Sequence, residues 1–413
     1  MLAEHIAGLR LVDNHVHGYW LSAGDRRRFE NALNEANTEP LADFDSGFDT
    51  QLGFAVRAHC APVLGLSTHV DPRAYWERRG QLSEPDLARL FLPAAGVSDW
   101  LVDTGLDADI AVLTQMSDAS GGRAHEVVRL EQVAEQAASA PGDYAAAFSQ
   151  ILGDRAATAV ATKSVLAYRG GFDGELSEPS CREVADAAAR WRDAGGARLS
   201  DRVLLRFGLH EALRLGKPLQ LHVGFRDRDC DLHRTNPMLL LDLLRRSGDT
   251  PVVLLHCYPY EREAGYLAQA FNNVYLDTGL SINHLGARAG PFIGRTLEMA
   301  PFRKILYSSD AVGPAELHYL GDGCGAPGSV RYCAVSWTAT SGARPTPSGS
   351  PTSSGATTRC GSTEWAAERS RSVAVAPVSY ARGAARALRH RFSRLAGTGP
   401  KRAGRGPNTV ESS

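Results

Sequence analysis

The segment LRLVDNHVHG at residues 9–18 places two histidines at the end of a short apolar run that is typical of a β-strand. Side chains of a strand alternate between its two faces, so His15 and His17 are expected to point to the same side. Two neutral imidazoles at this spacing suit a first-row divalent metal, although a histidine pair that only packs in a core is the commoner reason for such a motif. The ends of the other strands therefore decide what this motif means.

Short apolar runs alternate with helical patterns through the first 320 residues, which is typical of βα units around a parallel sheet. We predict strands at 9–15, 99–104, 125–131, 159–167, 218–223, 251–256, 273–279 and 304–309. The clearest helices are predicted at 142–154, 178–194, 198–215, 236–247, 261–271 and 287–299. Eight strands with intervening helices predict an α/β fold, a (β/α)8 TIM barrel over residues 1–320.

Residues 18–98 separate the first two predicted strands and are too long for a plain connection. They contain helical patterns such as SEPDLARLFL at 83–92. We therefore expect a helical insertion after strand 1 that forms a lid or cap over the mouth of the barrel.

The whole chain has 413 residues and a net charge of −1, because 45 Lys and Arg balance 46 Asp and Glu. This balance argues against a nucleic-acid binder or a polybasic membrane binder. No stretch approaches the ~18–20 apolar residues of a membrane span. No secretory signal is visible, and the seven scattered cysteines do not indicate a disulfide framework. We expect a cytoplasmic enzyme that acts on a small molecule, with a homo-oligomer left open.

The last 93 residues, 321–413, differ in composition from the rest. They carry a net charge of +9, and 43 of them are Gly, Pro, Ser or Thr. Such a segment buries too little apolar surface to offset its ordering entropy, so we predict a disordered tail. One explanation is a natural basic tail; the other, which we favour, is a frameshift in a GC-rich gene, because the chain has 41 Arg and only four Lys. A frameshift here predicts a barrel that lacks its last helix.

Four further polar residues stand at or just after the ends of predicted strands: Lys163, His222, His256 and Asp310. Active-site groups of such barrels project from the carboxyl ends of the strands. Of the 13 histidines in the chain, one or two would lie at strand ends by chance. Four histidines there, His15, His17, His222 and His256, together with Asp310, are hard to obtain by accident. The sequence therefore predicts an active site at the mouth of the barrel.

These motifs resemble the amidohydrolase superfamily of metal-dependent hydrolases. The similar segments are VDNHVHG (12–18), LHVG (221–224), LLHCYP (254–259) and YSSDA (307–311). KSVLAYRGG (163–171) is most similar to the amidohydrolase-related branch that includes FluG-like N-terminal domains. The resemblance implies His15, His17, His222 and His256 as metal ligands and Asp310 as both ligand and general base. It implies one or two divalent ions, with zinc expected and manganese or iron as alternatives.

Lys163 has two interpretations. It is either a cation that binds a substrate carboxylate or pairs with a buried acid, or a metal ligand. In several members of the superfamily the lysine of strand 4 is carbamylated and bridges two metals, since a carbamate is anionic and offers two oxygens. A bridging carbamate at Lys163 and a one-metal site are both left open.

The expected reaction is hydrolysis of an amide or a related C–N or C–O bond. A metal lowers the pKa of its water, Asp310 takes the proton, and His256 lies near the developing oxyanion. Arg169 and Tyr168 follow strand 4 and are candidate substrate-binding residues, with a structural ion pair equally open for Arg169. The alternatives are a metal-dependent non-oxidative decarboxylase of the same superfamily and an inactive, truncated or frameshifted product.

Overall fold

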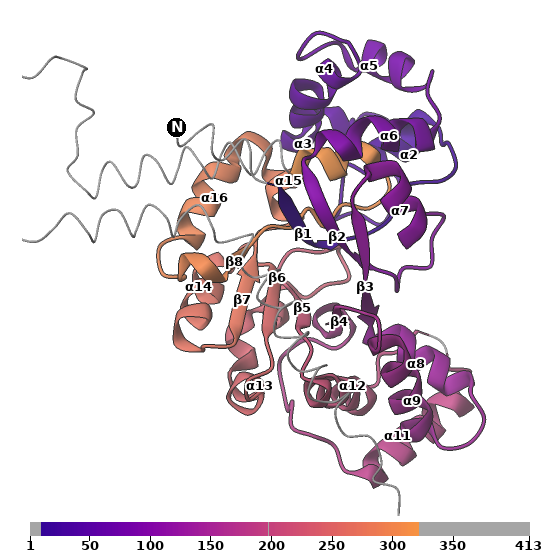
Figure 1. Cartoon of the computed structure of the whole chain (residues 1–413), viewed down its shortest axis with the longest axis vertical. Coiled ribbons are helices and arrows are strands. Elements are labelled where there is room, and N and C mark those ends of the chain that lie inside the picture. Colours follow the sequence, from indigo (N-terminus) through magenta and orange to yellow (C-terminus); the bar gives the residue numbers. More distant parts are fainter. Residues whose placement is uncertain (1–9, 197, 322–413) are drawn as a thin grey trace, which may run out of the picture.

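Eight parallel strands follow one another in chain order around a single sheet, β1 to β8 (Figure 1). The computed structural model describes residues 10–196 and 198–321. The strands are β1 (Leu11–Val16), β2 (Val97–Asp103), β3 (Arg123–Arg129), β4 (Ala161–Ser164), β5 (Leu219–Val223), β6 (Val252–His256), β7 (Val274–Asp277) and β8 (Ile305–Leu306). All eight lie where the sequence predicts a strand, and this order confirms the (β/α)8 barrel.

The barrel closes between β1 and the segment that follows β8. The backbone N–H of Asp310 donates to the carbonyl of His15 at 2.9 Å, and the N–H of His17 donates to the carbonyl of Ala311 at 2.9 Å. These bonds replace a regular strand ladder, because neighbouring strands are paired only from β1 through β8 in the described residues. The first and last segments of the barrel therefore meet where three of the predicted site residues lie.

β8 is shorter than the predicted strand at 304–309. The carboxylate of Asp13 accepts hydrogen bonds from the backbone N–H of Ser309 at 3.1 Å and from its hydroxyl at 2.5 Å. Both bonds are buried and hold Ser309 against Asp13 of β1. Asp310, the next residue, has a positive φ of 49°. Because Ser309 is held by these bonds to Asp13 and not by a strand ladder, β8 ends before it.

The barrel helices follow the predicted pattern. They are α7 (Leu113–Ser120), α8 (Leu130–Ser139), α9 (Tyr144–Ala156), α10 (Leu166–Arg169), α11 (Cys181–Asp193), α12 (Arg202–Leu215), α13 (Leu241–Arg246), α14 (Glu261–Ala270), α15 (Ser281–Leu285) and α16 (Ala289–Thr296). The helix predicted at 236–247 divides into a 3-10 turn, η4 (Pro237–Leu240), and α13. Asn236 caps this turn through the N–H of Met238, and Pro237 occupies its first position.

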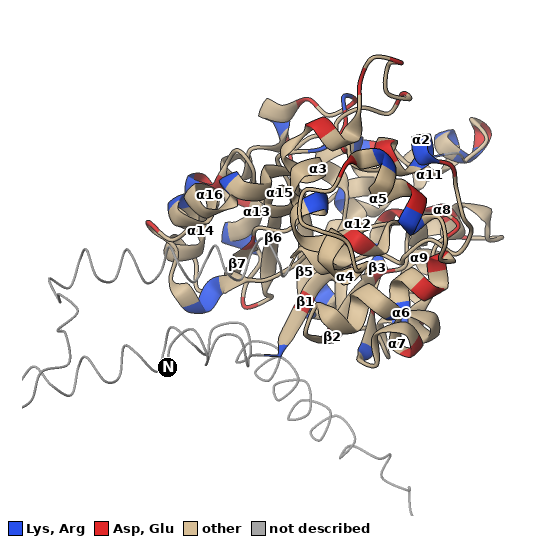
Figure 2. Ribbon diagram, turned by 90° about the horizontal axis from the view of Figure 1, so that it is seen from above, with Lys and Arg blue, Asp and Glu red and all other residues tan. Residues whose placement is uncertain are grey.

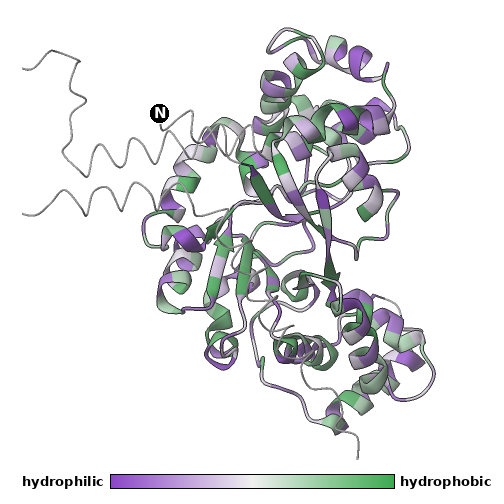
Figure 3. Cartoon of the chain, in the orientation of Figure 1, coloured by the Kyte–Doolittle hydropathy of each residue, from purple (hydrophilic) through white to green (hydrophobic). Residues whose placement is uncertain are grey.

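The apolar core lies inside the helix layer and against the strands. Every residue of β5 and β6 is buried, and Figure 3 shows the hydrophobic colouring concentrated on these strands and on β7. Parallel strands covered by helices on the outside and by one another across the barrel are expected to be apolar throughout. The polar residues at the strand ends are therefore exceptions that need a reason.

The insertion between β1 and β2 is helical, as predicted. It contains α2 (Arg26–Asn31), α3 (Gln51–Ala55), α4 (Ala61–Val63), α5 (Pro72–Arg79) and α6 (Glu84–Ala94). Its aromatic residues Phe29, Phe48 and Tyr75 belong to a hydrophobic cluster that also holds residues of β1, β2 and 311–320. The insertion therefore shares a core with the flank of the barrel, and α6 leads directly into β2.

A buried ion network joins the insertion to the residues that follow β8. Arg79 of α5 donates two hydrogen bonds to Glu84, at 2.8 and 2.9 Å, and two to Glu316, at 2.8 and 3.4 Å. The three side chains are at most 3% exposed. Glu316 belongs to a helical segment, 315–321. The predicted loss of the last helix and the predicted disordered tail concern residues beyond 321, outside the described part of the chain.

The outer surface mixes both signs of charge. Figure 2 shows blue and red residues interspersed on the helices around α14 and α16. Arg262 and Arg295 form ion pairs there with Glu298 and Glu261. Within residues 10–321, no helix combines the length and the apolar character that crossing a bilayer requires.

Candidate metal centre

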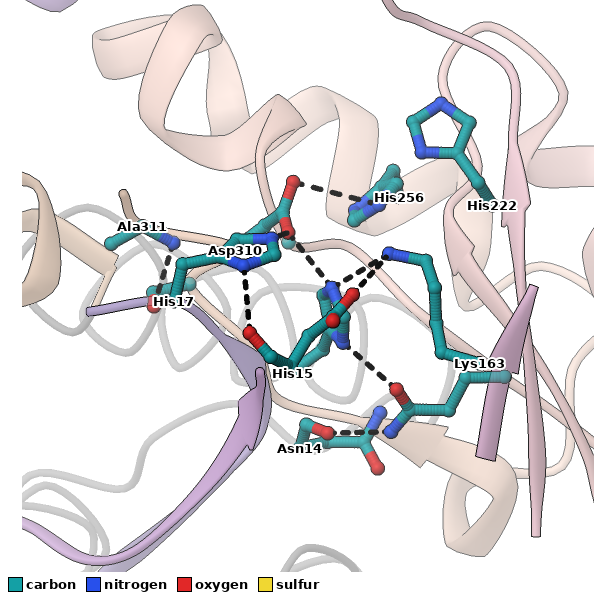
Figure 4. Close-up of polar contacts among 12 residues, drawn as sticks. Asn14, His15, His17, Lys163, His222, His256, Asp310 and Ala311 are labelled. Atoms are coloured by element: carbon teal, nitrogen blue, oxygen red, sulfur yellow. Dashed lines mark hydrogen bonds and ion pairs between the residues drawn. The ribbon is translucent and has the colours of Figure 1, made fainter. Parts of the chain in front are cut away.

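Three of the predicted ligands converge at the seam of the barrel (Figure 4). Nε2 of His15 lies 3.2 Å from Oδ1 of Asp310, and Nε2 of His17 lies 3.7 Å from the same oxygen. One ligand atom from each residue lies within 4.8 Å of the other two. His15 comes from β1, His17 follows it by two residues, and Asp310 is fixed beside both by the backbone bonds that close the barrel.

The orientation of His15 is set by the residues behind it. Its Nδ1 lies 2.8 Å from Oε1 of Gln220, and the amide nitrogen of Gln220 donates to the carbonyl of Asn14 at 2.7 Å. Because that carbonyl accepts from the amide nitrogen, the amide oxygen faces His15 and accepts the Nδ1 proton. Nδ1 of His15 therefore carries a proton and Nε2 faces the site, as in metal-binding histidines.

His17 is arranged in the same way. Its Nδ1 lies 3.2 Å from the carbonyl oxygen of Asp103, which can only accept, so Nδ1 carries the proton and Nε2 faces Asp310. Burial lowers the pKa of His17 to about 3 despite the nearby charges of Asp103 and Asp310, so the ring is neutral. Neutral rings with the free nitrogen turned inward can bind a cation.

His256 ends β6 with a positive φ of 69°, an uncommon conformation for a residue with a side chain. Its N–H donates to the buried carboxylate of Asp277 at 2.7 Å. Within the described residues, neither ring nitrogen has a hydrogen-bond partner, although Nε2 lies 3.5 Å from Oδ2 of Asp310. Strained backbone conformations tend to occur at functional sites, and here the strain turns an unsatisfied imidazole towards Asp310.

Asp310 lies between the histidines, with Oδ1 towards His15 and His17 and Oδ2 towards His256. Burial opposes its ionisation, but the neighbouring His256, His15 and His17 hold its pKa well below the ordinary value. Oδ1 is buried without a hydrogen bond among the described residues and faces the Nε2 atoms of His15 and His17. Lys163 donates to Nε2 of His15, but Oδ1 of Asp310 has no donor in the described residues, and a cation would satisfy it.

Lys163 of β4 lies between the histidines and a second acid. Its Nζ is 2.9 Å from Nε2 of His15 and 3.4 Å from Oδ2 of Asp103. Burial lowers the pKa of Lys163, and Asp103 acts in the opposite direction. The strand register thus brings Lys163 to the cluster, as expected for a residue of strand 4.

His222 lies beside the cluster (Figure 4). Its ring packs against that of His256 with centroids 4.6 Å apart, while its Nε2 donates to the carbonyl of Phe225 at 3.0 Å. This bond leaves Nδ1 as the nitrogen available to a ligand. Tyr168 packs edge-on against His222 at 5.0 Å, which places it at the site.

Arg169 points elsewhere. Its Nη1 donates to the carbonyl of Leu199 at 2.9 Å and lies 3.4 Å from the carboxylate of Glu135. This is the structural ion pair that the sequence leaves open as an alternative to a substrate contact. Successive side chains of a helix differ in direction by about 100°, so α10 turns Tyr168 and Arg169 to different sides.

Several residues at the mouth escape the sequence analysis. Asp103 ends β2 and Arg129 ends β3, and the two form a buried ion pair at 2.8 Å. The rule that strand ends carry active-site groups could have found both. Arg226 follows β5 and pairs with Glu35 of the insertion, and no periodic pattern marks either residue.

The residues present fit a divalent cation. The donors are two imidazole nitrogens with a fixed tautomer, one carboxylate and a further imidazole, which is the ligand chemistry of zinc and its neighbours. The unsatisfied buried atoms of His256 and Asp310 point to the same conclusion. A cation here would be held by His15, His17 and Asp310, with His256, His222 and Lys163 next to it.

Comparison with known proteins identifies the family. The sequence profile described as amidohydrolase matches residues 58–328, more than half of the chain. The chain belongs to the amidohydrolase family. The match begins after His15 and His17, so the first pair of this amidohydrolase's candidate ligands is placed by the structure and not by the profile.

Three further proteins extend the comparison. Protein fluG of Emericella nidulans is 28% identical over 348 residues, which cover 73% of this amidohydrolase and 39% of fluG. The amidohydrolase thus spans well under half of that protein. A candidate metal-dependent hydrolase from Lactobacillus casei is 29% identical with a TM-score of 0.67, over 80% of this chain and 89% of the other. A uronate isomerase from Bacillus halodurans, 13% identical with a TM-score of 0.56, shares the fold.

Proposed function

We propose that this amidohydrolase is a metal-dependent hydrolase that cleaves an amide or a related C–N or C–O bond of a small molecule. The observation that carries the proposal is the convergence of His15, His17 and Asp310 within 4.8 Å of one another at the mouth of the barrel. A divalent cation bound there supplies a water with a pKa near ~7 and a positive charge beside the scissile carbonyl. In this proposal zinc is the expected ion, and Lys163 and His222 complete its surroundings.

Asp310 is assigned the proton transfers. One of its oxygens faces His15 and His17, and the other faces His256, so a proton taken from the attacking water stays at the reaction centre. As the water oxygen bonds to the carbonyl carbon and the C–N bond breaks, Asp310 passes this proton to the leaving nitrogen. His256 has unsatisfied ring nitrogens that can bind an oxygen of the substrate.

Metal content and product analysis test this proposal together. The full-length protein should purify with one or two divalent ions per chain, and His222→Ala should hold fewer. With a panel of N-acyl amino acids in ¹⁸O-labelled water, the released acid should carry one labelled oxygen. A protein that binds no metal in stoichiometric amount contradicts the proposal. Release of carbon dioxide from an unsaturated or aromatic acid, with a single ion and an unmodified Lys163, would indicate the decarboxylase instead.

Gln220 offers a test of the metal site that leaves the ligands intact. Gln220→Leu removes the acceptor that fixes the tautomer of His15, so we expect metal affinity to fall by roughly 10–100-fold. The measurement is competition with a chelator of known affinity. Gln220→Glu keeps an acceptor and should retain most of the affinity, whereas equal losses in both variants would contradict the assigned role.

A further inference from the structure

A second charged group lies at the mouth, beside the candidate metal centre. Arg226 follows β5, and its guanidinium stacks on the ring of Tyr168 at 4.9 Å. The same ring contacts His222, which packs against His256. Arg226 is therefore connected to His256 through two side chains, those of Tyr168 and His222.

The partner of Arg226 comes from the insertion. Nη1 of Arg226 forms a hydrogen bond and ion pair with the carboxylate of Glu35. The side chain of Glu35 is 17% exposed and that of Arg226 is 32% exposed, so the pair sits at the boundary between the site and solvent. A carboxylate from outside the barrel thus occupies the guanidinium at the entrance.

This contact uses only part of the guanidinium. Arg226 can offer parallel donors to both oxygens of a carboxylate. In the described residues, Nε is buried without a hydrogen bond, and Asp227 lies 3.3 Å from it in a geometry that makes no hydrogen bond. Glu35 accepts from Nη1 alone, so a carboxylate that accepted from Nη1 and Nη2 together would make one more hydrogen bond than Glu35 does.

Glu35 is also poorly placed for a permanent structural contact. Burial raises its pKa; Arg226 acts against this, and the charges of Asp310 and Asp227 add to it. The carboxylate is thus held among like charges by one guanidinium. Because the side chain of Glu35 is 17% exposed, an anion that displaces it from Arg226 leaves its carboxylate next to solvent.

We propose that Arg226 binds a carboxylate of the substrate and that Glu35 occupies this position until the substrate displaces it. The proposal rests on the proposed hydrolase function and narrows its substrates to small molecules with a free carboxylate remote from the scissile bond. Glu35 is then an internal competitor, and displacing it loosens the contact between the insertion and the loop after β5.

Binding of glutarate to the full-length protein tests this proposal, with calorimetry as the readout and glutaramide, its uncharged diamide, as the ligand control. If Glu35 occupies Arg226 for about nine-tenths of the time, Glu35→Gln should tighten the Kd for glutarate by about tenfold. Arg226→Met should weaken glutarate binding at least about tenfold relative to the unaltered protein. The Kd of Arg226→Lys should lie between those of the unaltered protein and Arg226→Met, because lysine keeps the charge but not the two parallel donors. Glutaramide should bind none of these proteins measurably.

Glu39→Gln is the matched control. Glu39 pairs with Arg228 at 2.5 Å and joins the same two segments, and both side chains are more than half exposed. If loosening the insertion were enough, Glu39→Gln would tighten binding as much as Glu35→Gln, and the proposal would be overturned. It would also be overturned if Glu35→Gln bound glutarate no better than the unaltered protein, or if a folded Arg226→Met bound it equally well.

The outcome is separable from that of the hydrolase proposal. Loss of metal or of hydrolysis without a change in the glutarate series would reject the reaction and keep the carboxylate site. Metal-dependent hydrolysis, together with the same Kd for glutarate in the unaltered protein and in the Glu35 and Arg226 variants, would reject the carboxylate site alone.

Discussion

Asp310→Asn is expected to lower kcat/KM by about a thousandfold, the largest change in activity that one substitution should cause here. Asparagine has nearly the same shape and keeps an oxygen, but it cannot take the proton from the attacking water. The backbone N–H of Asp310 that helps to close the barrel is unchanged, so the unfolding temperature should stay within a few degrees. The measurement is steady-state kinetics with metal in excess, on whichever substrate the product assay identifies.

Asp99→Asn is the control for this substitution. Asp99 lies near the start of β2, at the opposite end of the strand from Asp103, and pairs with Arg123 and His125. Its loss should leave kcat/KM unchanged. An Asp310→Asn enzyme that kept more than a tenth of the activity would remove Asp310 from the proton transfer.

Arg79→Met is expected to produce the largest loss of stability, about 3–5 kcal/mol in the free energy of unfolding. Arg79 neutralises Glu84 and Glu316, which are almost completely buried and lie within 3 Å of it. Without the guanidinium these two carboxylates remain inside the protein without a counter-ion. The change is measured as a shift of the urea midpoint at neutral pH.

Two further variants separate charge from packing. Arg73→Met lies on the same helix, α5, and removes an exposed pair with Glu77, so the midpoint should not move. Adding Glu84→Gln and Glu316→Gln to Arg79→Met removes the uncompensated charge and should recover most of the loss. If the triple variant were as unstable as Arg79→Met alone, packing of Arg79 on Phe29 would be the main contribution instead.

The strands and most helices were predictable because their signals are local. β6 is a short apolar run that ends in a histidine, β5 is a short buried run that contains one next to its end, and helices such as α11 begin at a capping serine. β8 was predicted too long because its end depends on Asp13, almost 300 residues earlier in the chain, which captures Ser309. No local pattern contains such a contact.

The residues of the candidate site were predictable where they lie at the end of a strand with a local sequence signal. A residue at the end of a barrel strand projects into the mouth, which was sufficient for His15, Lys163 and Asp310. The prediction placed Arg169 just after a strand at 159–167, whereas β4 ends at Ser164 and α10 turns Arg169 towards Leu199. Arg226 and Glu35 could not be paired from the sequence, because the ion pair joins two irregular segments of unrelated pattern.

The closure of the barrel by Asp310 and β1 has a consequence for synthesis. His15 leaves the ribosome near the beginning of translation and Asp310 only after nearly the whole barrel has emerged, so no shorter nascent chain can assemble the cluster. An ion bound by both His15 and Asp310 would link the two ends of the barrel. Its binding free energy would add to the free energy of unfolding of the complete barrel. Removal of the ion by a chelator should then weaken the contact between the first and last strands and lower the free energy of unfolding, in addition to abolishing activity.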